Sequence, residues 1–195
     1  MASPWPEADM DDVTPSVRSG RPLDGEFADY VKPDIDRVRG DDAVTALDEQ
    51  AAQTSSFLES LSDAQICGMT YAPGKWTVKE LIGHVSDDER IFAYRALCLA
   101  RGDARALAGF DEERYVQFAE FEKQLLDTLL GNYRAVRHAT LTLFRTFSAE
   151  AWNRRGVVNG YGASARGLAF HMAGHELHHI RALREIYGLA PNRRP

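Results

Sequence analysis

A histidine-rich segment near the C-terminus carries the strongest structural signal in this sequence. Residues 171–179 read HMAGHELHH and contain four of the six histidines of the chain. Apolar side chains before, within and after the segment recur at the spacing of one helix face: Leu168, Met172, Ile180 and Leu183. The segment is therefore predicted to be an amphipathic helix whose histidines lie beside its buried face.

Two of these histidines are spaced to bind one metal ion together. At about 100° per residue, His175 and His179 lie one turn apart, next to the apolar face. His171 and His178 lie further toward the flank of the helix. Imidazoles at positions i and i+4 can hold one ion from a single helix face. Solvated histidines with one hydrogen-bonded core histidine are the alternative, but a cluster of this density favours a metal site.

Residues 175–179 also match the H-E-x-x-H pattern of zinc proteases, in which the glutamate is the general base. Such an enzyme needs a third protein ligand, usually downstream of the motif. Only sixteen residues follow His179, and their one acid, Glu185, is out of phase with the histidine pair by more than half a turn. A third ligand must then come from upstream, which argues against a protease.

Composition and charge limit the class of protein. A chain of 195 residues that is 44% hydrophobic and 27% charged fits one soluble globular domain. A net charge of −6 argues against a nucleic-acid partner. The two cysteines, Cys67 and Cys98, form no disulfide framework, and neither a signal segment nor a long apolar run is present. These observations predict a cytoplasmic protein without a membrane partner.

Apolar periodicity predicts an all-α fold, an antiparallel four-helix bundle with an N-terminal extension. Residues 1–25 are polar and proline-rich and are expected to form a flexible tail, and 26–190 to form the bundle domain. The expected helices cover 41–63, 77–101, 113–147 and 164–188, with Thr77 and Ser164 as N-caps and Glu80 completing a capping box with Thr77. Residues 152–162 are expected to be a loop with a turn at Asn159-Gly160.

Polar residues also mark the apolar stripe of the second predicted helix. His84 lies at the edge of that stripe, Asp88 follows one turn later, and Arg95 two turns after that. Polar side chains at the margin of a core stripe are candidates for a functional site.

Two blocks of the sequence resemble the DinB-like (damage-inducible) superfamily. The first is GKWTVKEL at 74–81, which leads into His84, and the second is HELHH at 175–179. The resemblance implies a four-helix bundle, often dimeric, with a divalent metal held by three histidines. Transferred to this sequence, the ligands are His84, His175 and His179, and the metal is expected to be zinc or nickel.

The resemblance also implies a function. Relatives include metal-dependent thiol S-transferases that use a low-molecular-weight thiol, and a mycothiol-dependent isomerase. We therefore expect an enzyme acting on a small-molecule substrate, with Asp88 and Glu176 as candidate catalytic residues and a homodimer as the assembly. Asp88 could orient a histidine or accept a proton; Glu176, inward by phase, could be a general base or a buried acid paired with an arginine. A metal-dependent hydrolase and a non-catalytic metal-binding stress-response module are the alternatives.

Overall fold

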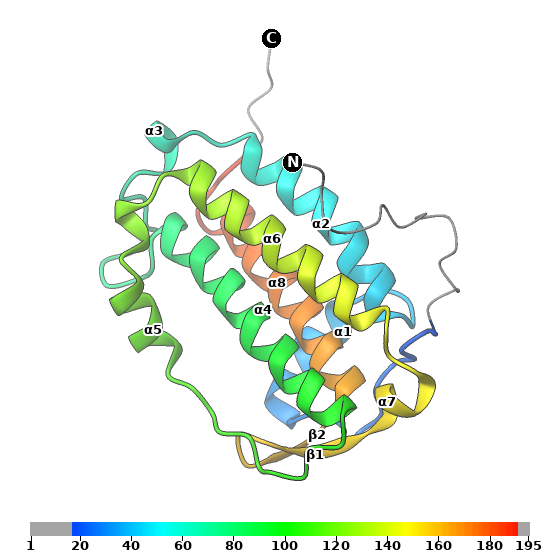
Figure 1. The fold of residues 1–195 in the computed structure, drawn as a ribbon. Helices are drawn as coiled ribbons and strands as arrows, with labels where there is room; N and C mark the ends of the chain where they lie inside the picture. Colours follow the sequence, from blue (N-terminus) through cyan, green and yellow to red (C-terminus); the bar gives the residue numbers. More distant parts are fainter. Residues whose placement is uncertain (1–16, 191–195) are drawn as a thin grey trace, which may run out of the picture.

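The computed structural model describes residues 17–190, and the regular structure of this part of the chain is mostly helical (Figure 1). Four long helices form a bundle: α2 (Ala43–Glu59), α4 (Val78–Ala100), α6 (Leu126–Phe144) and α8 (Ala165–Glu185). Shorter elements surround them: η1 (Asp29–Val31), α1 (Lys32–Arg37), α3 (Asp63–Ile66), α5 (Glu112–Ala119), η2 (Phe121–Lys123), α7 (Ala149–Asn153), β1 (Arg155–Val158) and β2 (Tyr161–Ser164). The predicted all-α four-helix bundle is confirmed. None of the helices in the described range is long and apolar enough to cross a membrane.

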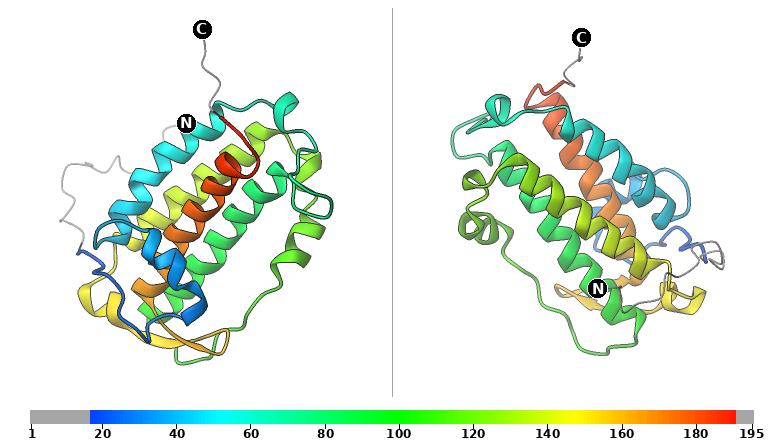
Figure 2. Two further views of the ribbon diagram at one scale, coloured as in Figure 1. Left: turned by 180° about the vertical axis from the view of Figure 1, so that it is seen from behind. Right: turned by 45° about the horizontal axis from the view of Figure 1, so that its top comes forward.

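The four helices form a ring in the order α4, α6, α2, α8, so that α2 lies diagonally opposite α4, and α6 opposite α8. α4 packs against α6 and α8, and α2 packs against the same two helices. Figures 1 and 2 show that α4 and α6 run in one direction and α2 and α8 in the other. Residues 101–125, which include α5, return along the bundle and allow α6 to begin at the same end as α4. The antiparallel neighbours are therefore α4 with α8 and α2 with α6.

The predicted helix starts of α4 and α8 are confirmed. The Thr77 side chain accepts a hydrogen bond from the Glu80 backbone N–H, and the Glu80 carboxylate accepts one from the Thr77 N–H at 2.7 Å. Ser164 accepts a hydrogen bond from the Gly167 N–H at 3.0 Å. These bonds satisfy amide groups that have no partner within the first turn of a helix.

The third predicted helix, 113–147, was wrong as one continuous element. The chain breaks after α5, at Glu120, whose φ of 51° is left-handed, and α6 begins only at Leu126. Phe118 is 70% exposed, so the apolar spacing that suggested one helix does not belong to one face. The break turns Phe121 into the bundle, where its ring occupies the space that a side chain at Gly83 would need.

A small hairpin replaces the predicted loop at 152–162. β1 and β2 pair antiparallel with Val158 opposite Tyr161, and the predicted turn at Asn159-Gly160 joins them. Both turn residues have positive φ, 51° and 82°, as a two-residue hairpin turn requires. Two four-residue strands are too short for an alternating pattern to be recognised in the sequence.

The described part of the expected tail, residues 17–25, packs against the bundle. The Ser19 backbone N–H donates to Asp42 Oδ1 at 3.0 Å, and Arg21 donates to the carbonyls of Ile35 and Val38 at 2.7 and 2.9 Å. The ordered body therefore extends before residue 26. The rest of the expected tail, residues 1–16, lies outside the described residues.

The core consists of two apolar clusters separated by buried polar side chains. On α4, α6 and α8 buried polar residues separate the apolar residues of one cluster from those of the other, and three of these polar positions, one on each helix, are joined by ion pairs. These positions are Glu89, Arg137 and Glu176, which are 1–2% exposed. Arg137 forms ion pairs with both glutamates, so each buried carboxylate of this polar layer has a cationic partner, which the two share.

Candidate metal centre

Antiparallel packing of α4 on α8 brings three histidines together. His84 comes from α4, and His175 and His179 come from consecutive turns of α8. The Nε2 atom of His175 lies 3.3 Å from that of His84 and 2.9 Å from that of His179. Among residues 17–190 these three form the one cluster of histidine, cysteine or acidic side chains that could hold a metal ion. The structure thus assembles the predicted ligand set, and metal binding by it stays a prediction.

The geometry of the three nitrogens fits a tetrahedral ion. Metal–nitrogen bonds of 2.0–2.1 Å at tetrahedral angles place the ligand nitrogens about 3.3 Å apart. The separation of His84 and His175 has this value, and that of His175 and His179 is slightly shorter. The ligand nitrogens of all three residues lie within 4.8 Å of one another, so the three imidazoles are within reach of one ion.

Burial keeps the three imidazoles neutral, which is the form that binds metals. Removal from water lowers the pKa of His84 to about 4 and that of His179 to about 3. The pKa of His175 is also lowered well below 6.5, by burial first and by the neighbouring histidines second. At neutral pH the ring nitrogens are therefore free of the charge that would repel a cation.

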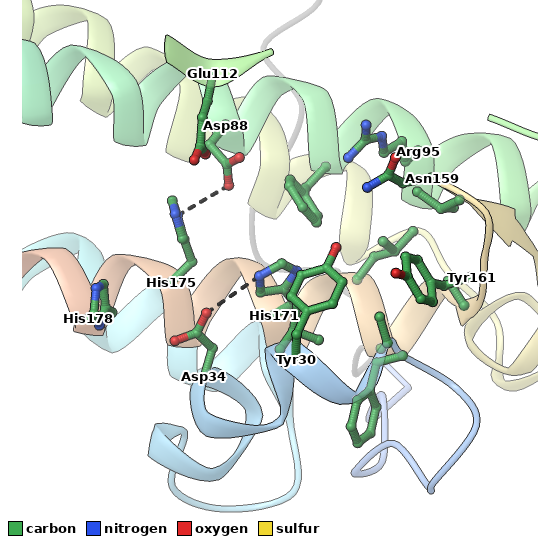
Figure 3. Close-up of a pocket in the computed structure, with 18 of the residues that line it drawn as sticks. Tyr30, Asp34, Asp88, Arg95, Glu112, Asn159, Tyr161, His171, His175 and His178 are labelled. Atoms are coloured by element: carbon green, nitrogen blue, oxygen red, sulfur yellow. Dashed lines mark ion pairs between the residues drawn. The ribbon is translucent and has the colours of Figure 1, made fainter. Parts of the chain in front are cut away.

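Asp88 lies next to this cluster, on the side away from the converging nitrogens. Its Oδ2 atom is 3.2 Å from Nδ1 of His175 (Figure 3). This contact favours the His175 tautomer that is protonated at Nδ1 and leaves Nε2 free to bind a metal. Burial raises the pKa of Asp88 well above its usual value, and the nearby Glu112 carboxylate adds to the effect. Of the two roles expected for Asp88, the geometry favours orientation of a histidine.

Glu176 points away from the histidines, into the polar layer of the core. Its carboxylate accepts hydrogen bonds from Thr54 at 2.6 Å and from Tyr133 at 3.0 Å, and it pairs with Arg137. It is not among the residues that line the cavity next to the histidines. Of the two roles considered from the sequence, the geometry matches the buried acid paired with an arginine.

A cavity of about 780 Å³ opens beside the histidine cluster. It lies between α4 and α8 and is closed by α1, the start of α5 and the hairpin (Figure 3). Aromatic side chains form much of its wall, namely Trp76, Phe92, Phe110, Tyr30 and Tyr161. The volume lies in the range of small-molecule binding sites.

Several residues of this site were not predicted from the sequence. Glu112 Oε2 lies 4.0 Å from Nε2 of His84, on the cavity side of the cluster. The Trp76 ring lies 4.6 Å from the His84 ring, and its N–H donates to Glu113 at 3.0 Å. Trp76 lies in the GKWTVKEL block that precedes His84, but its contact with the His84 ring was not predicted; Glu112 and Glu113 start a short helix that no periodicity or motif relates to the histidines.

The two remaining histidines of the cluster segment also line the cavity. Nε2 of His171 is 3.5 Å from a carboxylate oxygen of Asp34, on α1, and its ring lies edge-on to Phe92. His178 packs against the ring of His179. Neither belongs to the group whose nitrogens converge, in agreement with the helical phase.

Comparison with known proteins agrees with this architecture. The family model of the DinB superfamily matches residues 19–183. The chain belongs to the DinB superfamily. YfiT from Bacillus subtilis, described as a probable metal-dependent hydrolase with an unusual four-helix bundle topology, is similar with a TM-score of 0.66 and 18% identity. The alignment covers 76% of this chain and 87% of YfiT.

A mycothiol-dependent maleylpyruvate isomerase also shares the fold of this DinB-superfamily chain, with a TM-score of 0.58 and 18% identity. The match covers 71% of this chain but only 58% of the isomerase, so a large part of that enzyme has no counterpart here. A mutant of the same isomerase matches with a TM-score of 0.59 and 16% identity. No curated protein sequence matches the chain.

Proposed function

We propose that this protein is a metal-dependent enzyme that transfers or adds a low-molecular-weight thiol to a small electrophilic substrate. The observation that carries the proposal is the convergence of three neutral imidazoles on one wall of an open cavity. Three protein ligands leave coordination positions free for reactants, as in catalytic metal sites, whereas structural sites are closed by four.

A divalent ion at this site, zinc or nickel, would supply Lewis acidity and lower the pKa of a thiol or water that it binds. The protein contributes the neutral nitrogens of His84, His175 and His179. Asp88 holds His175 in the tautomer required for binding. Trp76 covers one face of His84 and limits the access of water to that ligand.

The size of the cavity favours thiol transfer over simple hydrolysis. Hydrolysis requires room for one organic molecule and a water, whereas thiol transfer requires room for two organic molecules. About 780 Å³ is enough for a small thiol beside a small electrophile. The DinB-superfamily isomerase described as mycothiol-dependent supports a thiol as the second reactant.

Glu112 is the residue best placed to accept the thiol proton. Its carboxylate faces the cavity 4.0 Å from His84 Nε2, and its side chain is 54% exposed. Burial and the adjacent acids Glu113 and Asp111 raise its pKa, which makes it a better base. In the proposed step the sulfur–carbon bond forms, the thiol proton passes to Glu112, and the leaving group of the electrophile departs.

Turnover of a generic electrophile tests the proposal. Metal-loaded protein is mixed with chlorodinitrobenzene, with and without glutathione, mycothiol or bacillithiol, and the dinitrophenyl thioether that forms as sulfur displaces chloride is followed by its absorbance. We expect turnover that requires both metal and one of the thiols. We expect Glu112→Gln to lower kcat by about 100-fold or more without loss of metal, while Glu113→Gln serves as the matched control.

A metal-dependent hydrolase is the second candidate, favoured by the similarity to YfiT, which is described as a probable enzyme of that class. Nitrophenyl acetate distinguishes the two. Hydrolysis that disappears with a chelator and ignores added thiol would reject thiol transfer. Absence of turnover with every electrophile and ester would instead favour a non-catalytic metal-binding module.

A further inference from the structure

Arg95 is a buried cation at the far end of the cavity from the histidines. It lies eleven residues after His84 on α4, which corresponds to three turns and roughly 16 Å along the helix axis. The residue is 5% exposed. Its guanidinium lies 5.1 Å from the centre of the Phe92 ring and 5.4 Å from that of Phe110. Both aromatic rings restrict its position without occupying its N–H groups.

The hairpin and the segment before α5 hold this arginine in place. Arg95 Nη2 donates to the carbonyl of Ala108 at 2.8 Å. That segment is fixed by the hairpin, because the Leu107 N–H donates to the Val157 carbonyl and the Asn159 N–H donates to the Leu107 carbonyl, both at 2.9 Å. The guanidinium is therefore held by a rigid framework rather than by a mobile surface loop.

Arg95 has no ion-pair partner within residues 17–190, although the buried Asp88, two turns earlier on α4, interacts with its charge at longer range. A guanidinium has five N–H donors, and the bond to Ala108 uses one nitrogen. No carboxylate of the described chain forms an ion pair with it. Its other nitrogens are not sealed in the protein, since Gln50 Oε1 is the one fully enclosed side-chain polar atom of this range without a hydrogen bond. Arg95 lines the cavity, where Figure 3 shows its guanidinium beside Asn159, and it also borders a second hollow next to Leu107 and Tyr115.

The surroundings of Arg95 favour an anionic group. Tyr30, Asn159 and Tyr161 lie around the same end of the cavity and add hydroxyl and amide groups (Figure 3). The acid at this end, Glu26, is neutralised by Arg155 and Arg166, each at 2.6 Å. A ligand carboxylate here would meet hydrogen-bond donors and a guanidinium that has no ion-pair partner.

Two acids without a cationic partner lie at the opposite end of the cavity. Glu112 lies 4.0 Å from His84, and Glu113 accepts a hydrogen bond from Trp76. The cavity is therefore electrostatically asymmetric, with free acids beside the histidines and a free cation three helix turns away. An elongated ligand with its negative charge directed toward Arg95 would avoid these acids.

We propose that Arg95 binds a carboxylate of the reacting molecule, so that the natural substrate or its thiol co-substrate is a small organic acid. This inference rests on the proposed function, because the reacting atom is assigned to the histidine cluster. A single charge is favoured over a phosphate, since the other arginine of the cavity, Arg37, is already paired with Asp34. A carboxylate can accept two parallel N–H bonds from one guanidinium.

Matched ligands test the proposed binding of a carboxylate by Arg95, here called the anchor, without requiring turnover. Zinc-loaded protein is titrated with straight-chain hydroxamic acids that carry a carboxylate at the other end, and with their methyl esters. The hydroxamate is a metal-binding group, and the chain length is varied to span the cavity. We expect the best acid to bind about 10- to 100-fold more tightly than its ester, and Arg95→Gln to abolish this difference. Arg37→Gln, the matched control, should leave the difference intact.

A further variant tests the role of the guanidinium shape, and a further ligand series shows which reactant carries the carboxylate. Arg95→Lys retains a charge but not the planar fork, so it should keep part of the preference for the acid. Mercaptoalkanoic acids and their methyl esters are titrated in parallel. A preference for the acid in this series alone assigns the carboxylate to the thiol, whereas one confined to the hydroxamates assigns it to the electrophile.

Two results would overturn the inference, and they have different meanings. If the esters bind in a zinc-dependent manner but the acids bind no better, the anchor is wrong and the metal-dependent function stands. If neither series binds in a zinc-dependent manner, the proposed function fails and the anchor fails with it. Thermal unfolding of each variant shows whether the protein that was titrated is folded.

Discussion

Two buried carboxylates of this protein are expected to have separable roles, and one pair of substitutions tests the separation. Glu176→Gln and Asp88→Asn each replace a carboxylate with an amide of nearly the same shape. Glu176 belongs to the polar layer of the core, whereas Asp88 contacts the histidine cluster. We expect the first substitution to reduce stability and the second to reduce metal affinity.

The magnitude for Glu176→Gln follows from its contacts. Breaking a buried ion pair costs about 3–5 kcal/mol when one charge is left alone. Arg137 keeps its bidentate pair with Glu89, at 2.8–3.1 Å, so the guanidinium stays partly neutralised. The glutamine oxygen can still accept from Thr54 and Tyr133, but the amide NH2 group would then face the Arg137 guanidinium, from which it cannot accept. We therefore expect a loss of about 2–3 kcal/mol in the free energy of unfolding.

The magnitude for Asp88→Asn follows from its contact with His175. Loss of a carboxylate that orients a metal-binding histidine lowers metal affinity by about 10- to 100-fold. Stability should remain close to that of wild type, because burial already disfavours the charged form of Asp88 and raises its pKa. The two substitutions should thus give opposite patterns.

Urea unfolding of the metal-free proteins and competition with a zinc-binding dye measure the two quantities separately. The reasoning is refuted if Glu176→Gln unfolds like wild type yet binds zinc more weakly than Asp88→Asn. That result would return Glu176 to the metal site and to its predicted catalytic role. Equal effects of both variants on both measurements would show that the polar layer and the site behave as one unit.

Three further predictions follow from the histidine cluster and the family. His175→Ala should abolish stoichiometric zinc binding in elemental analysis, whereas His178→Ala should retain it; retention by both would remove His175 from the site. The metal-free protein should lose stability as pH falls from about 6.5 to about 4, because the buried His84 and His179 have lowered pKa values of about 4 and 3 while the unfolded chain takes up protons near 6.5. Urea midpoints that do not change between pH 7 and pH 5 would contradict this. We also propose a homodimer, so light scattering should give twice the chain mass of 21.8 kDa, and the monomer mass at micromolar concentration would exclude it.

The bundle could be predicted from the sequence because its long helices carry periodic apolar faces and recognisable caps. Thr77 and Ser164 mark helix starts through local hydrogen bonds, which depend on few residues. The break at Glu120 could not be predicted in this way, because Phe118 and Leu125 continued the apolar spacing although both are exposed. Tertiary packing of Phe121 against Gly83 decides that part of the chain.

The histidine cluster was accessible from the sequence for a similar reason. His175 and His179 lie one turn apart on one helix, so their proximity is a local property, and family resemblance supplied His84. Glu112 reaches the cluster only because α5 lies against α4, which no local pattern indicates. The cavity end around Arg95 depends likewise on the hairpin, whose strands are too short to be predicted.

The polar layer also explains how the bundle keeps the site in register. Asp88 and Glu89 are consecutive on α4, and His175 and Glu176 are consecutive on α8, so each pair diverges by about 100° around its helix. One member of each pair faces the cavity, where Asp88 meets His175, and the other faces the core, where Arg137 bridges the two glutamates. A shift of α8 along α4 would break both contacts at once and leave a buried charge without its partner. The ion pairs in the core therefore fix the position of α8 along α4 at which the histidines of the two helices meet. None of the three ion-paired residues lines the cavity.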